Sequence, residues 1–184
     1  MLKILFMVLL FSFNNAHANE EAQYEVIEVI SDKIEIRNYP HLKLATVRSS
    51  LQSANNNFRD LFNFISGGNS EKQKIKMTIP VFQISEKNEN IMSFVLPYKF
   101  NNKELPLPDN KNIKIEELNN SKFIVLRFSG RANLTNFLEQ QKILEEIIAK
   151  KKIKADLTKP IRAYYNTPWT LPFLKRNEIL FRLK

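Results

Sequence analysis

Tyr24-Glu-Val-Ile-Glu-Val-Ile30 is followed by Lys33-Ile-Glu-Ile-Arg37, and both stretches alternate apolar and polar residues around Ser31-Asp32. Successive side chains of a strand point to opposite faces, so the alternation predicts two strands joined by a turn. The Tyr39-Pro40 step predicts a break, and 42–48 predicts a third strand after it. Three strands are therefore expected before the first helix.

A helical period follows these strands. Apolar residues at intervals of i, i+4, i+7, i+8 and i+11 share one face of a helix over 54–65, namely Ala54, Phe58, Leu61, Phe62 and Ile65. Ser53 is the expected N-terminal cap, and Gly67-Gly68 is the expected end of the helix.

The same order of elements then recurs. A proline-rich connector spans 105–110, and a second helix capped by Asn133 is expected over 134–150. Further strands are expected at 78–84, 91–96, 113–117, 123–128, 161–165 and 178–183. Strands, a helix and two more strands thus occur twice, as a repeat of pattern and not of identity. Two such halves predict an α+β fold, in which helices pack outside one mixed sheet or barrel.

The N-terminus has the three parts of a secretory signal. Lys3 supplies a positive charge, residues 4–13 are apolar except for Ser12, and Ala16-His17-Ala18 is a cleavage site of the A-x-A type. The apolar run is too short to span a bilayer. We therefore expect a cleaved signal at 1–18, a single domain at 19–184 and no membrane span in the mature chain. The protein would be periplasmic in a Gram-negative bacterium and secreted otherwise.

Composition limits the chemistry that the chain can perform. It has no cysteine, which excludes disulfides, thiolate metal sites and covalent haem attachment. The formal charge of +9 favours anionic partners, but no aromatic-plus-basic reading motif accompanies it, so nucleic-acid binding is not expected.

Catalytic motifs are missing from the sequence. The three glycines, at 67, 68 and 130, form neither a dinucleotide fingerprint nor a Walker loop. His17 would leave with the signal, so His41 is the sole histidine of the mature chain and no multi-histidine metal centre can form. No G-x-S-x-G elbow is present. Paired carboxylates remain possible because Glu and Asp are plentiful, but nothing in their spacing marks a pair of the glycosidase type. A binding protein is expected rather than an enzyme.

Three segments are candidates for a ligand site: the helix face with Phe58 and Phe62, the stretch around Met77, and 164–178. The last is an aromatic loop stiffened by two prolines, with Trp169, Phe173, Lys175 and Arg176. An apolar wall beside cations suits a flat ligand that carries carboxylates. The alternatives are plain core packing for the helix face, and a loop that covers the barrel end with Arg176 and Glu178 in structural hydrogen bonds.

These segments resemble the SOUL haem-binding protein family. The matching stretches occur in family order and cover nearly all of the mature chain; they are Ile34-Glu-Ile-Arg-Asn-Tyr39, Phe64-Ile-Ser-Gly-Gly-Asn69, Lys76-Met-Thr-Ile-Pro-Val81, Ser93-Phe-Val-Leu-Pro97, Leu105-Pro-x-Pro108, Arg127-Phe-Ser-Gly130 and Tyr165-Asn-Thr-Pro-Trp through Arg176-Asn-Glu178. The resemblance implies a distorted antiparallel β-barrel flanked by two helices and built from two βαββ-like halves. It also implies reversible, non-covalent binding of haem or a related tetrapyrrole.

By position, the resemblance places the porphyrin near Phe58 and Phe62 and near the loop 166–176. Asn55 and Asn63 stand where some members carry basic residues, so Arg59, Lys175 or Arg176 would have to meet the propionates. His41 is the first candidate for an axial iron ligand and Met77 the second, and hydrophobic binding without a ligand is equally open.

The expected function is that of an exported haem- or tetrapyrrole-binding protein, acting as a carrier, buffer or sensor. Two alternatives remain open. One is an enzyme that acts on a tetrapyrrole or another small ligand in the same cleft. The other is an envelope interaction module that binds a peptide, a lipid or another small molecule, because fold-level analogy transfers function poorly.

Overall fold

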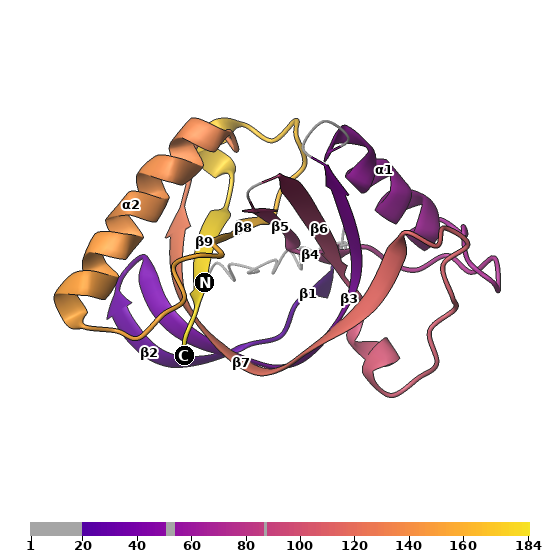
Figure 1. Cartoon of the computed structure of the whole chain (residues 1–184), viewed down its shortest axis with the longest axis horizontal. Coiled ribbons are helices and arrows are strands. Elements are labelled where there is room, and N and C mark those ends of the chain that lie inside the picture. Colours follow the sequence, from indigo (N-terminus) through magenta and orange to yellow (C-terminus); the bar gives the residue numbers. More distant parts are fainter. Residues whose placement is uncertain (1–19, 51–53, 87) are drawn as a thin grey trace, which may run out of the picture.

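In a computed structural model of the chain, residues 20–50, 54–86 and 88–184 are described. The signal segment expected at 1–18, its cut before Asn19 and the helix cap expected at Ser53 lie outside these residues. Antiparallel strands enclose the centre of the molecule, and two helices lie on opposite sides of them (Figure 1).

Six of the strands close into a barrel. Each pairs antiparallel with the next, and the last pairs back with the first, in the order β3 (Ile34–Ser50), β6 (Glu89–Val95), β5 (Val81–Glu86), β8 (Ile161–Tyr164), β9 (Asn177–Arg182) and β7 (Ile113–Phe128). Closure leaves the barrel strands without a continuous free edge. The α+β class and the antiparallel barrel flanked by two helices are thereby confirmed.

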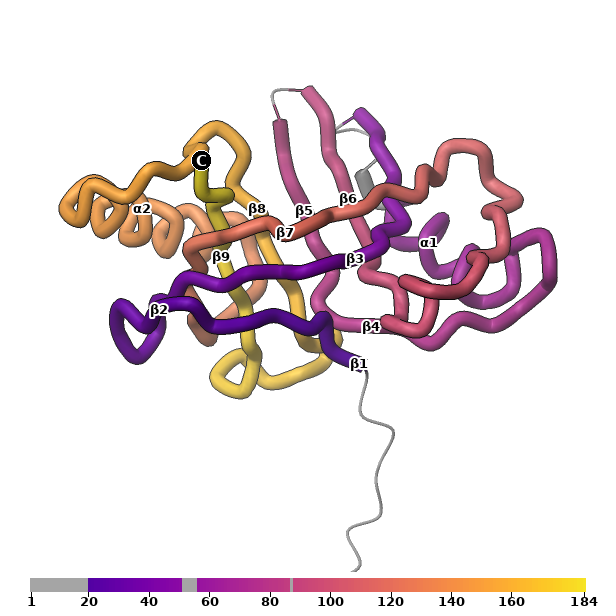
Figure 2. Tube along the Cα trace, turned by 90° about the horizontal axis from the view of Figure 1, so that it is seen from below, coloured from indigo at the N-terminus to yellow at the C-terminus, as the bar shows by residue number. Residues whose placement is uncertain are grey.

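Three more strands lie in the described part of the chain. β2 (Glu25–Ser31) forms a hairpin with the first part of β3, and β1 (Glu20–Glu21) pairs in parallel with β4 (Thr78–Ile79). Seen at right angles to the first view, the β5–β6 hairpin and the β8–β9 loop lie at opposite ends of the molecule (Figure 2).

Two expected strand breaks are wrong. β3 runs through Pro40, and β7 joins the two strands expected at 113–117 and 123–128. The two irregular places face each other, since Tyr39 pairs with Ser121 and His41 pairs with Asn119. At Pro40, β3 has a partner on one side only, because its pairs with β2 end at Asn38 and those with β6 begin at Leu44. A proline is tolerated where a strand has such a local edge.

The helices agree closely with the sequence pattern. α1 (Ala54–Ile65) ends before Gly67, whose φ of 116° favours glycine, and a Cβ on Gly68 would lie 2.8 Å from the Asn63 carbonyl oxygen. α2 (Leu134–Lys151) is capped by Asn133, whose side chain accepts a hydrogen bond from the Asn136 amide. The expected caps at Gly67-Gly68 and Asn133 are therefore confirmed.

The described residues pack into three apolar clusters. α1 buries Leu61, Phe64 and Ile65 against the outer face of β3 and β6, and α2 buries Phe137, Leu144 and Ile148 against β7 and β9. Inward side chains of the strands fill part of the barrel itself. Two short 3-10 turns, η2 (Tyr98–Asn101) and η3 (Pro172–Leu174), lie in the connections. Within the described ranges, neither helix has the length and apolar character needed to cross a bilayer.

Candidate functional site

A cleft of about 360 Å³ lies on the outside of the barrel, between α1 and the start of the β8–β9 loop. We call it the α1 cleft. Phe58 forms its helix side, outward residues of the strands form its base, and the loop supplies its far wall; the lining residues are Phe58, Met77, Ile79, Val81, Gln83, Met92, Tyr164, Tyr165, Asn166, Thr167 and Pro168. Most of them are apolar or aromatic, which is typical of a small-molecule site.

Phe58 and Phe62 lie at the edge of the buried face of α1. Their rings stack with centroids 6.1 Å apart, and Phe58 also meets the buried ring of Phe94 edge to face. Phe58 is 45% exposed and Phe62 is 47% exposed, whereas Leu61, which precedes Phe62 in the sequence, is fully buried. The apolar face predicted for this helix is therefore only partly packed. Leu61 and Ile65 are buried, whereas Phe58 and Phe62 lie at the border of the face, where a ligand can reach them.

The aromatic loop faces away from the cleft over most of its length. Pro168 lines the cleft, but Trp169 is 91% exposed and Phe173 is 71% exposed, and neither belongs to the lining. The loop is nevertheless well anchored, because the Arg176 amide donates to the Asn166 side chain and the Gly130 amide donates to the Pro172 carbonyl. The structure thus brings Phe58 and Met77 together with the base of this loop and leaves its aromatic tip in solvent.

The candidate cations differ in their availability. Lys175 reaches the cleft's far wall, where its Nζ donates to the Pro168 carbonyl at 3.1 Å. Arg59 is exposed on α1 and donates to the neighbouring Asn56. Arg176 is engaged elsewhere: its guanidinium donates to Glu178 and Glu21 and lies 3.7 Å from the centre of the Tyr165 ring. Lys175 is consequently the best-placed cation of the three.

Glu178 is the centre of a buried ionic cluster behind the cleft. The carboxylate is fully buried and accepts hydrogen bonds from Arg37, Arg176 and Tyr165. Burial alone would raise the pKa of the Glu178 carboxyl, but the hydrogen bonds and charge of Arg37, with the charge of Arg176, lower it below its usual value. Burial raises the pKa of the Tyr165 hydroxyl far above its usual value, so Tyr165 stays a donor. The cluster links β3 and β9 to Tyr165, the residue that follows β8.

Because the folded-state pKa of Glu178 is depressed, its contribution to stability is present above the unfolded carboxyl pKa of about 4.3. That contribution is lost as the pH falls through the lower folded value. We expect urea midpoints of the wild type to decline below about pH 4, and to decline less steeply in Glu178→Gln. Parallel pH profiles for the two proteins between pH 3 and 7 would contradict this assignment.

The two candidate axial ligands lie in different places. His41 is on β3, where its Nε2 lies 3.7 Å from the Glu117 carboxylate and its carbonyl accepts from Asn101, and it lines neither this cleft nor the barrel interior. Met77 lines the α1 cleft and is joined there by Met92. In the part of the chain that the structure describes, no three histidine, aspartate or glutamate residues gather into a metal centre.

Several lining residues could not be singled out from the sequence. Met92, Gln83 and Tyr164 sit on strands whose outward face is known only once the barrel closes. The Tyr164 hydroxyl donates to the Gln83 side chain at 3.0 Å, which places one polar pair on the base of a mostly apolar cleft. The signal available was the strand pattern of 78–84, but it did not tell which face would meet a ligand.

The fold and cleft define a class: a small closed barrel with a mostly apolar, partly open cleft beside its first helix. The sequence profile of the SOUL heme-binding protein family matches residues 19–182. The chain therefore belongs to the SOUL haem-binding protein family, whose members bind haem or related tetrapyrroles.

Solved structures share the fold at low sequence identity. An uncharacterized conserved protein from Listeria innocua superposes with a TM-score of 0.63 at 10% identity, covering 83% of this chain and 92% of its own. A hydrolase from Listeria innocua superposes with a TM-score of 0.60 at 8% identity, and the match covers 91% of this chain and 94% of the hydrolase. The C-terminal domain of EcmrR superposes with a TM-score of 0.57 at 14% identity, and the match covers 88% of this chain and 98% of that domain. No curated protein sequence matches the chain. At these identities the structural likeness establishes the fold alone.

Proposed function

We propose that the chain binds haem or a related tetrapyrrole reversibly in the α1 cleft and acts as a carrier, buffer or sensor outside the cytoplasm. The observation that carries the proposal is the half-exposed Phe58–Phe62 pair beside a cleft lined by Met77 and Pro168, in a chain of a haem-binding family. One side of the macrocycle would lie against Phe58 and the base of the cleft. Apolar area removed from water stabilises such a complex by roughly 25 cal/mol per Å².

Export rests on the sequence pattern of 1–18. A signal cut after Ala18 would leave a chain that begins just ahead of β1. The compartment would be the periplasm of a Gram-negative host, or the medium otherwise.

Binding without catalysis is also proposed. The family is one of binding proteins, and the sequence lacks the nucleophile and metal motifs of common hydrolases. The hydrolase from Listeria innocua shares the fold but only 8% of its residues, so its activity does not carry over. If iron is ligated from the protein, the methionines of the cleft are better placed than His41.

Titration of haem into the mature protein tests the proposal. We expect a saturable Soret shift at micromolar haem, together with quenching of Trp169, the single tryptophan of the chain. A linear, unsaturable absorbance change, equal to that of a control protein, would overturn it. A Soret position that changes in Met77→Leu but not in His41→Ala would assign the axial ligand.

Lys175→Gln is expected to weaken haem binding three- to tenfold, because the Lys175 ammonium lies at the cleft wall beside Pro168 and a propionate pair on an exposed site contributes about 1 kcal/mol. Arg131→Gln is the matched control, since Arg131 is an exposed cation outside the cleft. The haem dimethyl ester lacks the propionate charges, so its affinity should be the same for the wild type, Lys175→Gln and Arg131→Gln. An equal loss of affinity for the ester would show that Lys175 acts through the loop and not through the propionates.

A second function, as an interaction module, is favoured by one observation. The loop tip exposes a run of large apolar side chains, Trp169, Leu171, Phe173 and Leu174. Exposed apolar patches often mark contact surfaces. A pull-down that survives Phe58→Asp but fails in Trp169→Ser would support this function beside haem binding.

A further inference from the structure

The tip of the β8–β9 loop, residues 168–175, holds large apolar side chains in solvent. Trp169 is 91% exposed, Phe173 is 71% exposed, and Leu174 and Leu171 are 62% and 55% exposed. The loop projects from the end of the molecule opposite the β5–β6 hairpin (Figure 2). Exposed apolar side chains gathered on one segment mark a contact surface. A projecting tip suits a partner into which it can sink, whereas an extended peptide or a helix would need a groove.

The backbone of the loop tip already has hydrogen-bond partners. Several amides donate to carbonyls of the loop at 3.0 to 3.2 Å, namely those of Thr170, Leu174 and Lys175. Pro168 and Pro172 have no amide hydrogen, and their carbonyls accept from the Lys175 ammonium and the Gly130 amide. Unpaired backbone groups are what makes a loop costly to take out of water. The loop tip can therefore enter a drier environment at a lower cost than an ordinary loop.

Positive charge surrounds the loop tip. Neither 127–138 nor 161–177 contains an aspartate or a glutamate. The hydrogen bond from the Gly130 amide to the Pro172 carbonyl holds these two segments together. The carboxylate of the buried ionic cluster is paired inside the molecule, so it does not cancel the charge at the surface. The cations that remain beside the loop tip include Arg127, Arg131 and Lys175.

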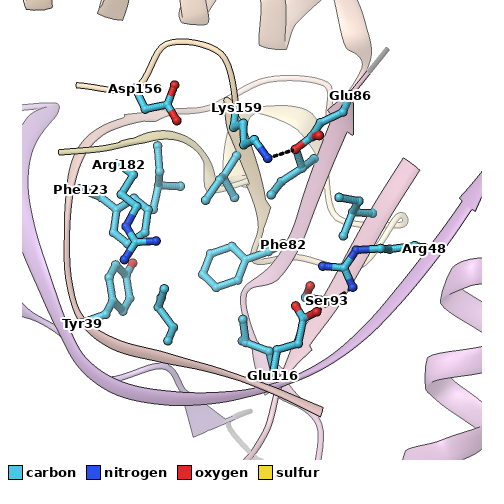
Figure 3. Close-up of a pocket in the computed structure, with 16 residues that line it drawn as sticks. Tyr39, Arg48, Phe82, Glu86, Ser93, Glu116, Phe123, Asp156, Lys159 and Arg182 are labelled. Carbon is cyan, nitrogen blue, oxygen red and sulfur yellow. Dashed lines mark ion pairs between the residues drawn. The ribbon is translucent and has the colours of Figure 1, made fainter. Parts of the chain in front are cut away.

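The opposite end of the barrel has a different surface. A cavity of about 440 Å³ inside the barrel is lined at that end by charges of both signs (Figure 3). Glu116 pairs with Arg48 at 2.7 Å and Glu86 pairs with Lys159 at 2.9 Å, and Asp156 lines the same cavity. Cations and carboxylates balance each other there, and the carboxylates would repel an anionic surface. Of the two ends, the one with the loop tip is therefore suited to an anionic partner.

We propose that the loop tip docks on the surface of an anionic lipid bilayer, with Trp169, Phe173 and Leu174 in the interfacial layer and with Arg131 and Lys175 against the lipid phosphates. Tryptophan is enriched in that layer because its ring is apolar and its N–H is polar. Burial of apolar side chains and attraction of Lys and Arg to anionic headgroups act together in such peripheral binding. The proposal names the partner of the interaction function described above and rests on it, but it does not depend on haem binding.

Trp169 is the single tryptophan of the chain, so tryptophan emission reports directly on the loop tip. The mature protein, without haem, is mixed with vesicles of equal parts phosphatidylglycerol and phosphatidylcholine. We expect the emission to shift to shorter wavelength, and brominated phosphatidylcholine in the same vesicles to quench it. Vesicles of phosphatidylcholine alone should bind the protein far more weakly. An unshifted emission with the anionic vesicles, or equal binding to both kinds of vesicle, would overturn the proposal.

Phe173→Ser is expected to weaken co-sedimentation with the anionic vesicles about tenfold, because a large apolar side chain no longer leaves water. Leu174→Ser should weaken it several-fold. Leu107→Ser is the matched control for Leu174→Ser, since Leu107 is 70% exposed but belongs to the connector at 105–110. All three side chains are exposed, so the variants are expected to fold. Equal losses in Leu174→Ser and Leu107→Ser would contradict docking through the loop tip.

The charge of the loop tip is tested by the double variant Arg131→Gln/Lys175→Gln, which should lose affinity for the anionic vesicles. Lys150→Gln/Lys151→Gln removes the same charge at the C-terminal end of α2 and should keep it. Equal losses would assign the binding to overall charge and overturn the proposal. A protein captured through Trp169 without any vesicle binding would also overturn it, while leaving the interaction function in place. Haem titration is a separate readout, so a retained Soret shift in a protein that ignores vesicles refutes bilayer docking alone.

Discussion

Replacing Glu178 with glutamine is expected to lower the free energy of unfolding by about 3–5 kcal/mol, the usual cost of removing one partner of a buried ion pair. Arg37 is 2% exposed and donates to both carboxylate oxygens, at 2.7 and 3.0 Å, and Arg176 donates to one of them. Without the negative charge, two guanidinium groups would lie close together, one of them out of reach of water. Urea unfolding followed by far-UV circular dichroism measures the effect, since Trp169 is too exposed to report on it.

Glu116→Gln is the matched control for this prediction. Glu116 also pairs with an arginine on a barrel strand, but its side chain is 38% exposed. Exposed pairs contribute about 0–1 kcal/mol, so the control should stay within that range. Equal losses in the two variants would mean that burial does not set the strength of the Glu178 cluster.

Phe58→Asp is expected to weaken haem binding by a factor of ten or more, equivalent to about 1.4 kcal/mol. The substitution removes the aromatic wall of the α1 cleft and places a carboxylate where the macrocycle would lie, and that charge also repels propionates. Soret titration measures the dissociation constant, and circular dichroism shows that the variant is folded.

Leu138→Asp on α2 is the control for Phe58→Asp. Leu138 is exposed to a similar degree, but it belongs to the other helix and does not line the α1 cleft. Haem affinity of this variant should match the wild type. Similar weakening by both substitutions would point to a general effect of charge or stability, and would move the haem site away from the α1 cleft.

Much of the fold was readable from local patterns. Periodicity predicted both helices to within a residue or so, because each buries one stripe against the barrel and the stripe repeats every turn. Strand lengths were less predictable. Pro40 and the polar run Asn119-Asn120-Ser121 each suggest a break when taken alone, yet they face each other across one long ladder that tolerates both.

The candidate site was also predictable only in part, because a sequence shows which residues are apolar but not which of them line a cleft. Phe58, Met77 and the base of the loop could be proposed from the sequence and its family resemblance, and the structure places them around one cleft. Phe62 and the loop tip at Trp169 and Phe173 lie outside its lining. An exposed aromatic residue and one that lines a cleft look the same in a sequence.

The sequence by itself determined the two helices and the places of most strands, which residues are apolar, and which chemistries are excluded by the lack of cysteine and the shortage of histidine and glycine. Only the tertiary structure decided that Arg176 is committed to Glu178, that His41 lies away from the α1 cleft, and that Phe62 lies outside the lining of that cleft. The reason is that these relations join strands far apart in the chain. Barrel closure sets them, and no local period encodes which distant strand will be the neighbour.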